Sequence, residues 1–338
     1  MDLYYINILY MSRKFNLDYE MIHLTADINR TAPNIDVEMI NPWGAVIVGD
    51  TIWIANNGTG VISNYTIDGK KLNNSVIVDL GSNSRGRPTG IVKYDGTGFL
   101  ISNGLTSAPA KLIIVTEDGS INAYNPVIST TNALEIIDSP GKTFKGAEIV
   151  NDNLYVTDFK NGLIEKYDSS FNLVAQFTDP DLVAALYTPF NVYEICCKLY
   201  VTFARNNAVC PFVGGGGEED VPGIGNGYID VFDLQGSLLE RFASRGPLNS
   251  PWGMAELRVC KCEHLYRYLL VGNAGDGKIN IFNLKTKKYV SNIETDGGGA
   301  IIADRLWSII IHCESDILFT SGVDAEQHGI YGVLKNTN

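Results

Sequence analysis

Hydrophobic and polar positions follow a unit of about 50 residues that recurs along the chain. Each unit carries a motif of the form Gly-x-Ile-x-x-Tyr/Phe, typical of a short β-strand. The motif glycines are Gly60, Gly119, Gly162, Gly227 and Gly277, with a degenerate sixth copy at Gly329. Repetition at this period is typical of propeller blades.

Each unit holds four short strands, which we letter A to D in chain order. In the first unit, Asn41-Pro42-Trp43-Gly44 starts strand A, and Trp53-Ile54-Ala55-Asn56 forms strand B. The Gly-x-Ile motif is strand C, and Val76-Ile77-Val78 is strand D. In the second unit we place strand B at Leu100-Ile101-Ser102-Asn103. We therefore predict an all-β fold, a six-bladed β-propeller of four-stranded antiparallel blades.

The sixth unit has strands A to C but no segment for strand D before Asn338. A closed ring needs that edge covered. The segment Ile22-His23-Leu24-Thr25-Ala26 alternates like a strand, so we expect it to complete the last blade and close the ring. Residues 21–338 then form one propeller domain, and residues 1–20 are an N-terminal extension.

Composition excludes some classes of function. Hydrophobic residues make up 45% of the 338, enough for a large core, and the net charge is −12. Because a chain this acidic repels the phosphate backbone of nucleic acids, we expect no nucleic-acid partner. No run approaches the roughly 20 apolar residues of a membrane span, so we expect none. The N-terminus lacks the basic start and cleavage site of a signal peptide.

The connections of a four-stranded antiparallel meander alternate between two faces. The B–C loops and the D-to-A connections share one face, here called the B–C face, and the A–B hairpins share the other, the hairpin face. The B–C face receives the loop residues Asn57 and Asp276 and the long insertion 204–226 with Glu218, Glu219 and Asp220. That insertion is either an acidic lid or a solvated loop.

Asn or Asp ends strand B in most units. These residues are Asn56, Asn103, Asp158 and Asn273. Their oxygens can ligate a hard cation such as Ca²⁺. They can equally accept hydrogen bonds from the backbone of tight turns, and the recurrence of the column favours turn capping. One calcium held by a subset of them is the alternative.

Three tryptophans, Trp43, Trp252 and Trp307, begin A strands near the expected axis. Packing between blades is the simpler interpretation. A stacking floor for a sugar or another flat ligand is the alternative.

Only one of the four histidines, His328, falls in a loop of the B–C face. With Asp324 and Glu326 it is a candidate acid–base group. A lone loop histidine more often has no catalytic role. No nucleophile elbow, phosphate-binding loop or HExxH motif occurs, and the six cysteines lack zinc-type spacing.

Several ordered segments together resemble a known family. They include Asn41-Pro42-Trp43-Gly44, Ala55-Asn56-Asn57-Gly58-Thr59-Gly60 and Ser250-Pro251-Trp252-Gly253. The chain resembles a bacterial family of propellers that is distantly similar to NHL-repeat and gluconolactonase-like proteins. The resemblance implies a six-bladed fold and an extracellular location, and brings no established activity. Abundant Asn, Ile and Lys also fit a protein of a large DNA virus, so a virion-associated location is the other hypothesis.

Two functions follow from these patterns. The first is a non-enzymatic binding or structural propeller that presents its B–C face to a ligand, a glycan or a protein partner. The alternative is a metal-assisted hydrolase or lyase, lactonase-like, acting at the channel mouth. Its ligands would be Asn56, Asp158 and Asn273, and its base His328 or Asp324.

Overall fold

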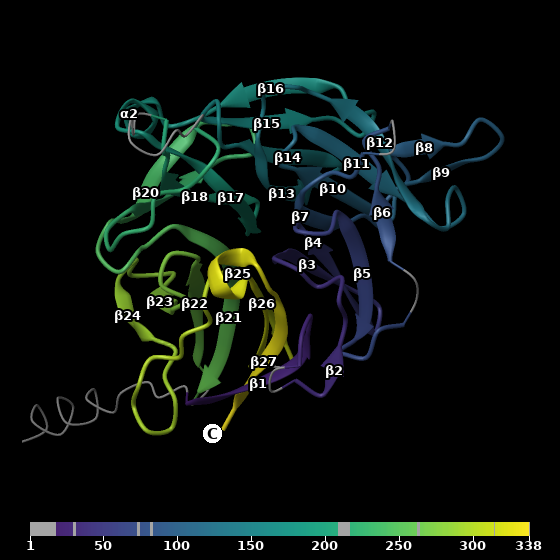
Figure 1. Ribbon diagram of the computed structural model, residues 1–338. Helices are drawn as coiled ribbons and strands as arrows, with labels where there is room; N and C mark the ends of the chain where they lie inside the picture. Colours follow the sequence, from purple (N-terminus) through teal and green to yellow (C-terminus); the bar gives the residue numbers. More distant parts are fainter. Residues whose placement is uncertain are drawn as a thin grey trace, which may run out of the picture.

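The computed structural model describes residues 18–29, 32–72, 75–81, 84–208, 217–261, 264–313 and 315–337. The fold is all-β, with mostly antiparallel sheets arranged like the blades of a propeller (Figure 1). The described helices are short: α2 (Pro180–Ala184) and α3 (Val323–Glu326).

Strands from the whole length of the chain surround a central axis (Figure 1). In the described residues, each of these inner strands contacts the next, and the last contacts the first. In order they are β3 (Pro42–Val48), β7 (Pro88–Lys93), β13 (Phe144–Val150), β17 (Tyr187–Ile195), β21 (Pro251–Lys261) and β25 (Leu306–His312).

Each inner strand begins an antiparallel meander. The first adds β4 (Thr51–Asn56), β5 (Val61–Thr66) and β6 (Val76–Val78) to β3, and the second adds β10 (Leu112–Thr116), β11 (Ser120–Tyr124) and β12 (Asn132–Asp138) to β7. A short parallel pairing of β6 with β12 joins these two meanders into one eight-stranded sheet.

The next three meanders are separate four-stranded sheets. Their further strands are β14 (Asn153–Asp158), β15 (Leu163–Tyr167) and β16 (Leu173–Phe177); β18 (Lys198–Arg205), β19 (Gly227–Phe232) and β20 (Leu238–Ser244); and β22 (His264–Asn273), β23 (Ile279–Asn283) and β24 (Tyr289–Asn292).

The last sheet contains both ends of the described chain. After β25 come β26 (Asp316–Ser321) and β27 (Ile330–Asn336), and β1 (Tyr19–Ala26) then pairs antiparallel with β27. A two-residue strand, β2 (Asn34–Ile35), adds to β1 in parallel. Since β1 starts at Tyr19, the boundary expected after residue 20 falls inside this strand. Residues 1–17 of the expected extension lie outside the described residues.

One strand prediction is wrong. The segment predicted as strand B of the second unit forms instead a separate hairpin of β8 (Leu100–Ser102) and β9 (Ser107–Pro109), which projects away from the ring (Figure 1). The strand that pairs with both β7 and β11 is β10. Asn103 therefore lies in the tip of this side hairpin, and Glu117 follows the true strand B.

Glycine allows the inner strands to approach each other closely. A Cβ atom on Gly44 would lie 2.4 Å from the backbone oxygen of Thr89 on the neighbouring strand β7. A Cβ atom on Gly253 would lie 2.3 Å from the backbone oxygen of Trp307. The repeated Pro-Trp-Gly signature thus has a packing reason, because no other residue fits at the narrow axis.

Candidate functional site

The tryptophans at the starts of the inner strands form an aromatic plug on the axis. Trp43 and Trp307 stack with ring centroids 3.5 Å apart and planes 16° apart, and Trp252 meets Trp43 edge-on at 5.8 Å. Phe159 and Phe190 complete the cluster. The exposed fractions of Trp43, Trp252 and Trp307 are 2%, 4% and 0%. These indoles are therefore almost fully buried and pack against one another between the blades.

Hydrogen bonds hold two of these indoles in place. The Nε1 of Trp307 donates to Oδ1 of Asn41 (3.0 Å), and the Nε1 of Trp252 donates to the backbone oxygen of Lys145 (3.2 Å). The two acceptor residues, Asn41 and Lys145, lie at the B–C end of the axis. These hydrogen bonds therefore attach the plug to the residues at that end.

A buried ion pair covers the plug. Lys145, on β13, pairs with Glu117, and its Nζ lies 4.9 Å from the ring centroid of Trp43. The two side chains are 1% and 7% exposed. The Nδ2 of Asn57 donates to Glu117 (3.0 Å), and Arg87 lies 3.5 Å from the same carboxylate.

Charge pairing keeps both members of this ion pair ionised. Burial alone would raise the pKa of Glu117, but Lys145 and Arg87 hold that pKa below its usual value. Burial alone would lower the pKa of Lys145, but Glu117, Glu219 and Asp220 raise it above its usual value. Buried charges are tolerated when they are paired in this way.

A second ion pair lies beside the first. Arg305 contacts Glu326 at 2.6 Å and Asp220 at 3.5 Å, and Asn41 donates to Glu326 at 2.8 Å. Desolvation raises the pKa of Glu326, in spite of Arg305. We call Glu117, Lys145, Glu219, Asp220, Arg305 and Glu326 the charged cluster. Its members come from loops and strands of different meanders and meet only in the folded ring.

The sequence identified only part of this cluster. Glu219, Asp220 and Glu326 were expected on the B–C face, whereas Glu117, Lys145 and Arg305 were missed. Strand B ends on Asn or Asp in three other units, but β10 ends on Thr116, so Glu117 lies one residue outside that pattern and left no signal of its own. The third acidic residue of the insertion, Glu218, pairs with Lys160 at 2.7 Å. Residues 209–216 of that insertion lie outside the described residues.

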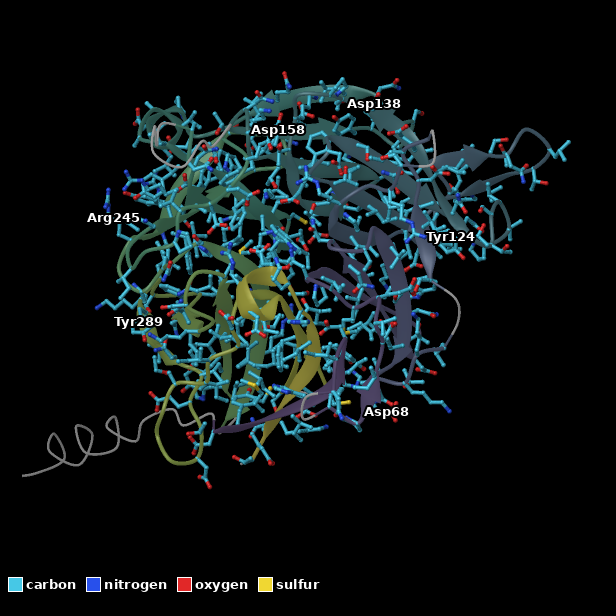
Figure 2. The ribbon with its side chains drawn as sticks, in the orientation of Figure 1. Asp68, Tyr124, Asp138, Asp158, Arg245 and Tyr289 are labelled. Atoms are coloured by element: carbon cyan, nitrogen blue, oxygen red, sulfur yellow. The ribbon has the colours of Figure 1, made fainter. Side chains whose placement is uncertain are left out.

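The predicted metal column makes hydrogen bonds within the protein. Asp158, labelled in Figure 2, accepts from the backbone nitrogens of Thr143 (3.3 Å) and Asn161 (3.2 Å). Asn273 accepts from the backbone nitrogen of Asn249 (3.1 Å), and Asn56 donates to Ser63 (2.9 Å). These contacts are those expected of residues that fasten loops.

Asn103 does not belong to this column. Its Oδ1 accepts from the backbone nitrogens of Leu105 (3.0 Å) and Thr106 (2.9 Å) in the tip of the β8–β9 hairpin. Its expected place beside the other three is wrong because the hairpin is an insertion. Within the described ranges, no group of three or more His, Cys, Asp or Glu side chains could hold a metal ion.

The structure gives His328 a different carboxylate from the predicted one. Its Nδ1 lies 2.6 Å from Oδ2 of Asp27, and the other oxygen of Asp27 accepts from the backbone nitrogen of Gly329 (3.0 Å). Because Asp27 follows β1, this contact fastens β1 to the β26–β27 connection. Asp324 is exposed, and its backbone nitrogen donates to Asp304 (3.2 Å). The last predicted loop residue, Asp276, accepts from Asn273 (3.0 Å).

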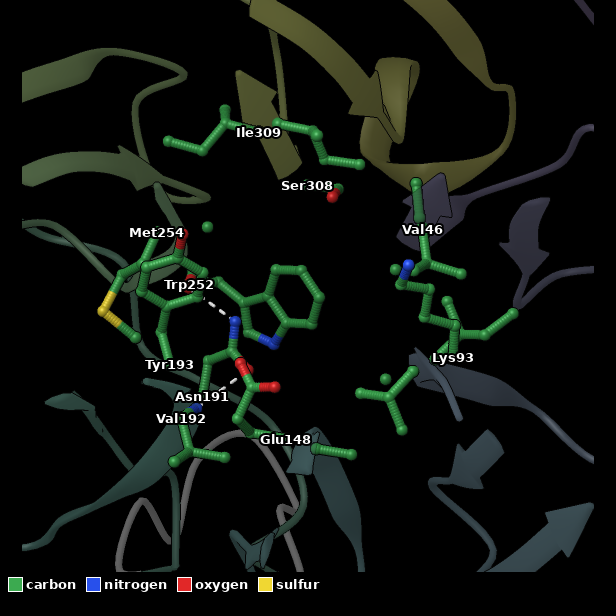
Figure 3. Close-up of a pocket in the computed structure, with 18 of the residues that line it drawn as sticks. Val46, Lys93, Glu148, Asn191, Val192, Tyr193, Trp252, Met254, Ser308 and Ile309 are labelled. Atoms are coloured by element: carbon green, nitrogen blue, oxygen red, sulfur yellow. Dashed lines mark hydrogen bonds between the residues drawn. The ribbon is translucent and has the colours of Figure 1, made fainter. Parts of the chain in front are cut away.

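A cavity of about 370 Å³ lies along the axis on the other side of the plug. A stretch of every inner strand lines it, and Trp252 from the plug lines it as well (Figure 3). Most of its lining side chains are aliphatic, and the polar ones are those of Lys93, Glu148, Asn191, Tyr193 and Ser308. The sequence predicted a central channel with the candidate site at its B–C mouth, and did not identify the lining of this cavity.

Comparison with known proteins finds viral proteins that are similar to this chain. No known protein-family profile matches it. Two uncharacterised proteins of Acanthamoeba polyphaga mimivirus, R648 and L690, are each 32% identical to it over 327 residues. The alignments cover 94% of this chain and 80% and 85% of the two relatives. The chain belongs to this mimivirus protein family.

The structural comparison supports the fold. A chain in the crystal structure of a nidogen/laminin complex matches with a TM-score of 0.51 at 14% identity, over 82% of this chain and 87% of that chain. At that identity the match shows a propeller-like fold alone. The similarity to mimivirus proteins agrees with the expectation drawn from the abundance of Asn, Ile and Lys, whereas the virion-associated location and the resemblance to a bacterial family stay expectations. Within the described ranges no helix is long and apolar enough to cross a membrane.

Proposed function

We propose that this member of the mimivirus family is a non-enzymatic binding propeller of six four-stranded blades. Six meanders around a ring of contacting inner strands support this count. On this account the eight-stranded sheet is two blades, since only two residue pairs of β6 and β12 join its halves. The pairing of β1 with β27 supports closure of the last blade by the N-terminal strand.

The B–C face is the proposed binding surface. The observation that carries this proposal is the sealed axis, where the aromatic plug lies under the buried pair of Lys145 and Glu117. A sealed and internally paired axis makes a rigid platform, and rigid scaffolds that present loops are common recognition surfaces. An open channel mouth with unpaired groups would have suited catalysis better.

The partner that suits this face is a protein with basic surface residues. Glu219 of the charged cluster is exposed, as are Asp304 and Asp324 beside the cluster, and the whole chain carries a net charge of −12. An acidic face attracts a basic partner and speeds its association. A glycan would instead need an open aromatic ring, and the three axial indoles are buried.

The hydrolase alternative finds less support. Asp158 and Asn273 use their oxygens in loop contacts, and His328 lies against Asp27. A bound divalent ion at this end of the axis would revive that alternative.

Cross-linking mass spectrometry tests the proposed face. The protein is incubated with an extract of its source cells and treated with a lysine-specific cross-linker. We expect cross-links to the partner at Lys160 and Lys278, which lie in B–C loops. Lys93 and Lys198, on the hairpin face, are the matched control. Cross-links confined to the control lysines, or retention of glycans alone on a glycan array, would contradict the proposal.

A further inference from the structure

The axial cavity has the form of a small-molecule site. Its volume of about 370 Å³ lies in the range of ligand pockets, and its wall combines aliphatic side chains with few polar groups. Val46, Ile149 and Ile310 line it and are only partly buried, so their side chains face the open space. Because the plug closes the B–C end, we place the opening at the hairpin face.

One carboxylate in this wall lacks a cationic partner. Glu148 accepts hydrogen bonds from the backbone nitrogens of Ile149 (3.0 Å) and Glu194 (3.4 Å), and it forms no ion pair within the described ranges. Figure 3 shows its carboxylate directed into the cavity beside Asn191 and Trp252. The amide of Asn191 is engaged elsewhere, donating to Trp252 and accepting from Val192.

The groups around Glu148 do not neutralise it. Burial raises the pKa of Glu148 to about 7, and the nearby carboxylate of Glu194 adds to the rise. Tyr193 lies on the same strand as Glu194, and its hydroxyl accepts from the backbone nitrogen of Glu256 (3.4 Å). Across the cavity, Lys93 pairs with Asp95 at 3.2 Å, and both are exposed. An unneutralised carboxylate in an apolar wall favours a cation.

We propose that the axial cavity binds a small organic ammonium ion, with its apolar body against the aliphatic wall and its charged head on Glu148. An inorganic cation such as Ca²⁺ fits poorly, since it requires six to eight oxygen ligands. This inference goes beyond the proposed function, because it concerns the opposite side of the plug from the B–C face.

Three probes of similar shape and different charge test this inference. They are 2-phenylethylamine, 2-phenylethanol and 3-phenylpropanoate, each titrated into the full-length protein by calorimetry at pH 8. We expect the amine to bind most tightly. We expect its affinity to fall about tenfold at pH 6, where Glu148 is largely protonated and the amine is still charged.

Variants locate the site. Glu148→Gln keeps the shape of the side chain and should weaken amine binding at least tenfold. Glu194→Gln removes the same charge from the chain and should have a much smaller effect. Val46→Trp fills the cavity from a partly exposed position and should abolish binding. Melting curves confirm that each variant is folded.

Several outcomes would overturn the inference. They are equal binding of the three probes, no binding of the amine at millimolar concentration, and unchanged binding by Glu148→Gln or Val46→Trp. None of these outcomes bears on the partner cross-links expected at the B–C face, so the two proposals fail separately.

Discussion

Lys145 and Glu117 form an ion pair that is buried directly over the ring of Trp43. Lys145 comes from the inner strand β13, and Glu117 from the turn after β10 in the neighbouring meander. The pair therefore joins two blades above the aromatic plug. Because each charge neutralises the other, the two charged side chains can be buried at the axis and close its B–C end.

Breaking this pair should destabilise the fold strongly. Lys145→Met leaves the carboxylate of Glu117 buried without its main partner, a loss of about 3–5 kcal/mol. The double variant Lys145→Met/Glu117→Met removes both charges and should regain part of that loss. Denaturation in urea measures all three proteins. A single variant as stable as the wild type would show that the pair is not a buried charge pair.

The axial glycines offer a second test. Gly44→Ala places a methyl group against the backbone of β7, where a Cβ atom would lie 2.4 Å from an oxygen. We expect loss of soluble protein or a lower melting temperature, because backbone cannot move aside cheaply. Gly297→Ala is the matched control, since its nearest neighbouring atom would lie 3.9 Å away. Equal melting temperatures for the two variants would contradict the tight packing.

The sequence predicted the fold well because the repeat is strong. The motif at Gly60 and its later copies placed most C strands, and the alternation in Ile22–Ala26 indicated the strand that pairs with β27. The second unit failed because the β8–β9 hairpin has the same apolar pattern as a blade strand. The hydrophobic pattern indicates which residues are buried. It does not show which of two neighbouring apolar segments, here β8 and β10, pairs with the rest of the blade.

The site was harder to predict. Lys145 follows Phe144 at the start of a buried strand, where a charged residue leaves no motif. Its role depends on Glu117 and Asn57, which reach it only through the closure of the ring. Glu148 likewise has no sequence signal, because what distinguishes it is the cavity that six strands form together.

Glu148 should make stability depend on pH. Its pKa is about 7 in the folded protein and 4.5 in its ordinary state. The folded state therefore holds the proton more tightly, and this contribution to stability is present below pH 4.5 and lost as pH rises through 7. Glu148→Gln should thus be more stable than the wild type at pH 8, by about 3 kcal/mol, with the gain vanishing near pH 4.5.

Denaturation at both pH values measures this difference. Glu218→Gln, a change of an exposed carboxylate, should stay within about 0.5 kcal/mol of the wild type at each pH. A Glu148→Gln variant that is less stable than the wild type at pH 8 would contradict the absence of a cationic partner. Removing a carboxylate such as Glu148 from the wall of a binding site often stabilises a protein, because functional groups are retained there at a cost in stability.

Calcium should not stabilise the protein. Of the strand-end oxygens, Oδ1 of Asn56 lacks a hydrogen-bond partner in the described ranges, whereas Asp158 and Asn273 use theirs. One free oxygen is too few for calcium. We expect no rise in melting temperature with millimolar CaCl₂ and no calcium by elemental mass spectrometry. One calcium per chain with a raised melting temperature would instead favour the hydrolase alternative.

The most direct test of the account compares partner binding by two charge-reversal variants. Glu219→Lys/Asp304→Lys changes the B–C face, and Asp50→Lys/Asp95→Lys makes the same change of charge on the hairpin face. Affinity for the cross-linked partner is measured for both by surface plasmon resonance. We predict that the first variant loses at least tenfold in affinity and that the second binds like the wild type. Loss of binding in the second variant alone would place the partner on the hairpin face and contradict the account.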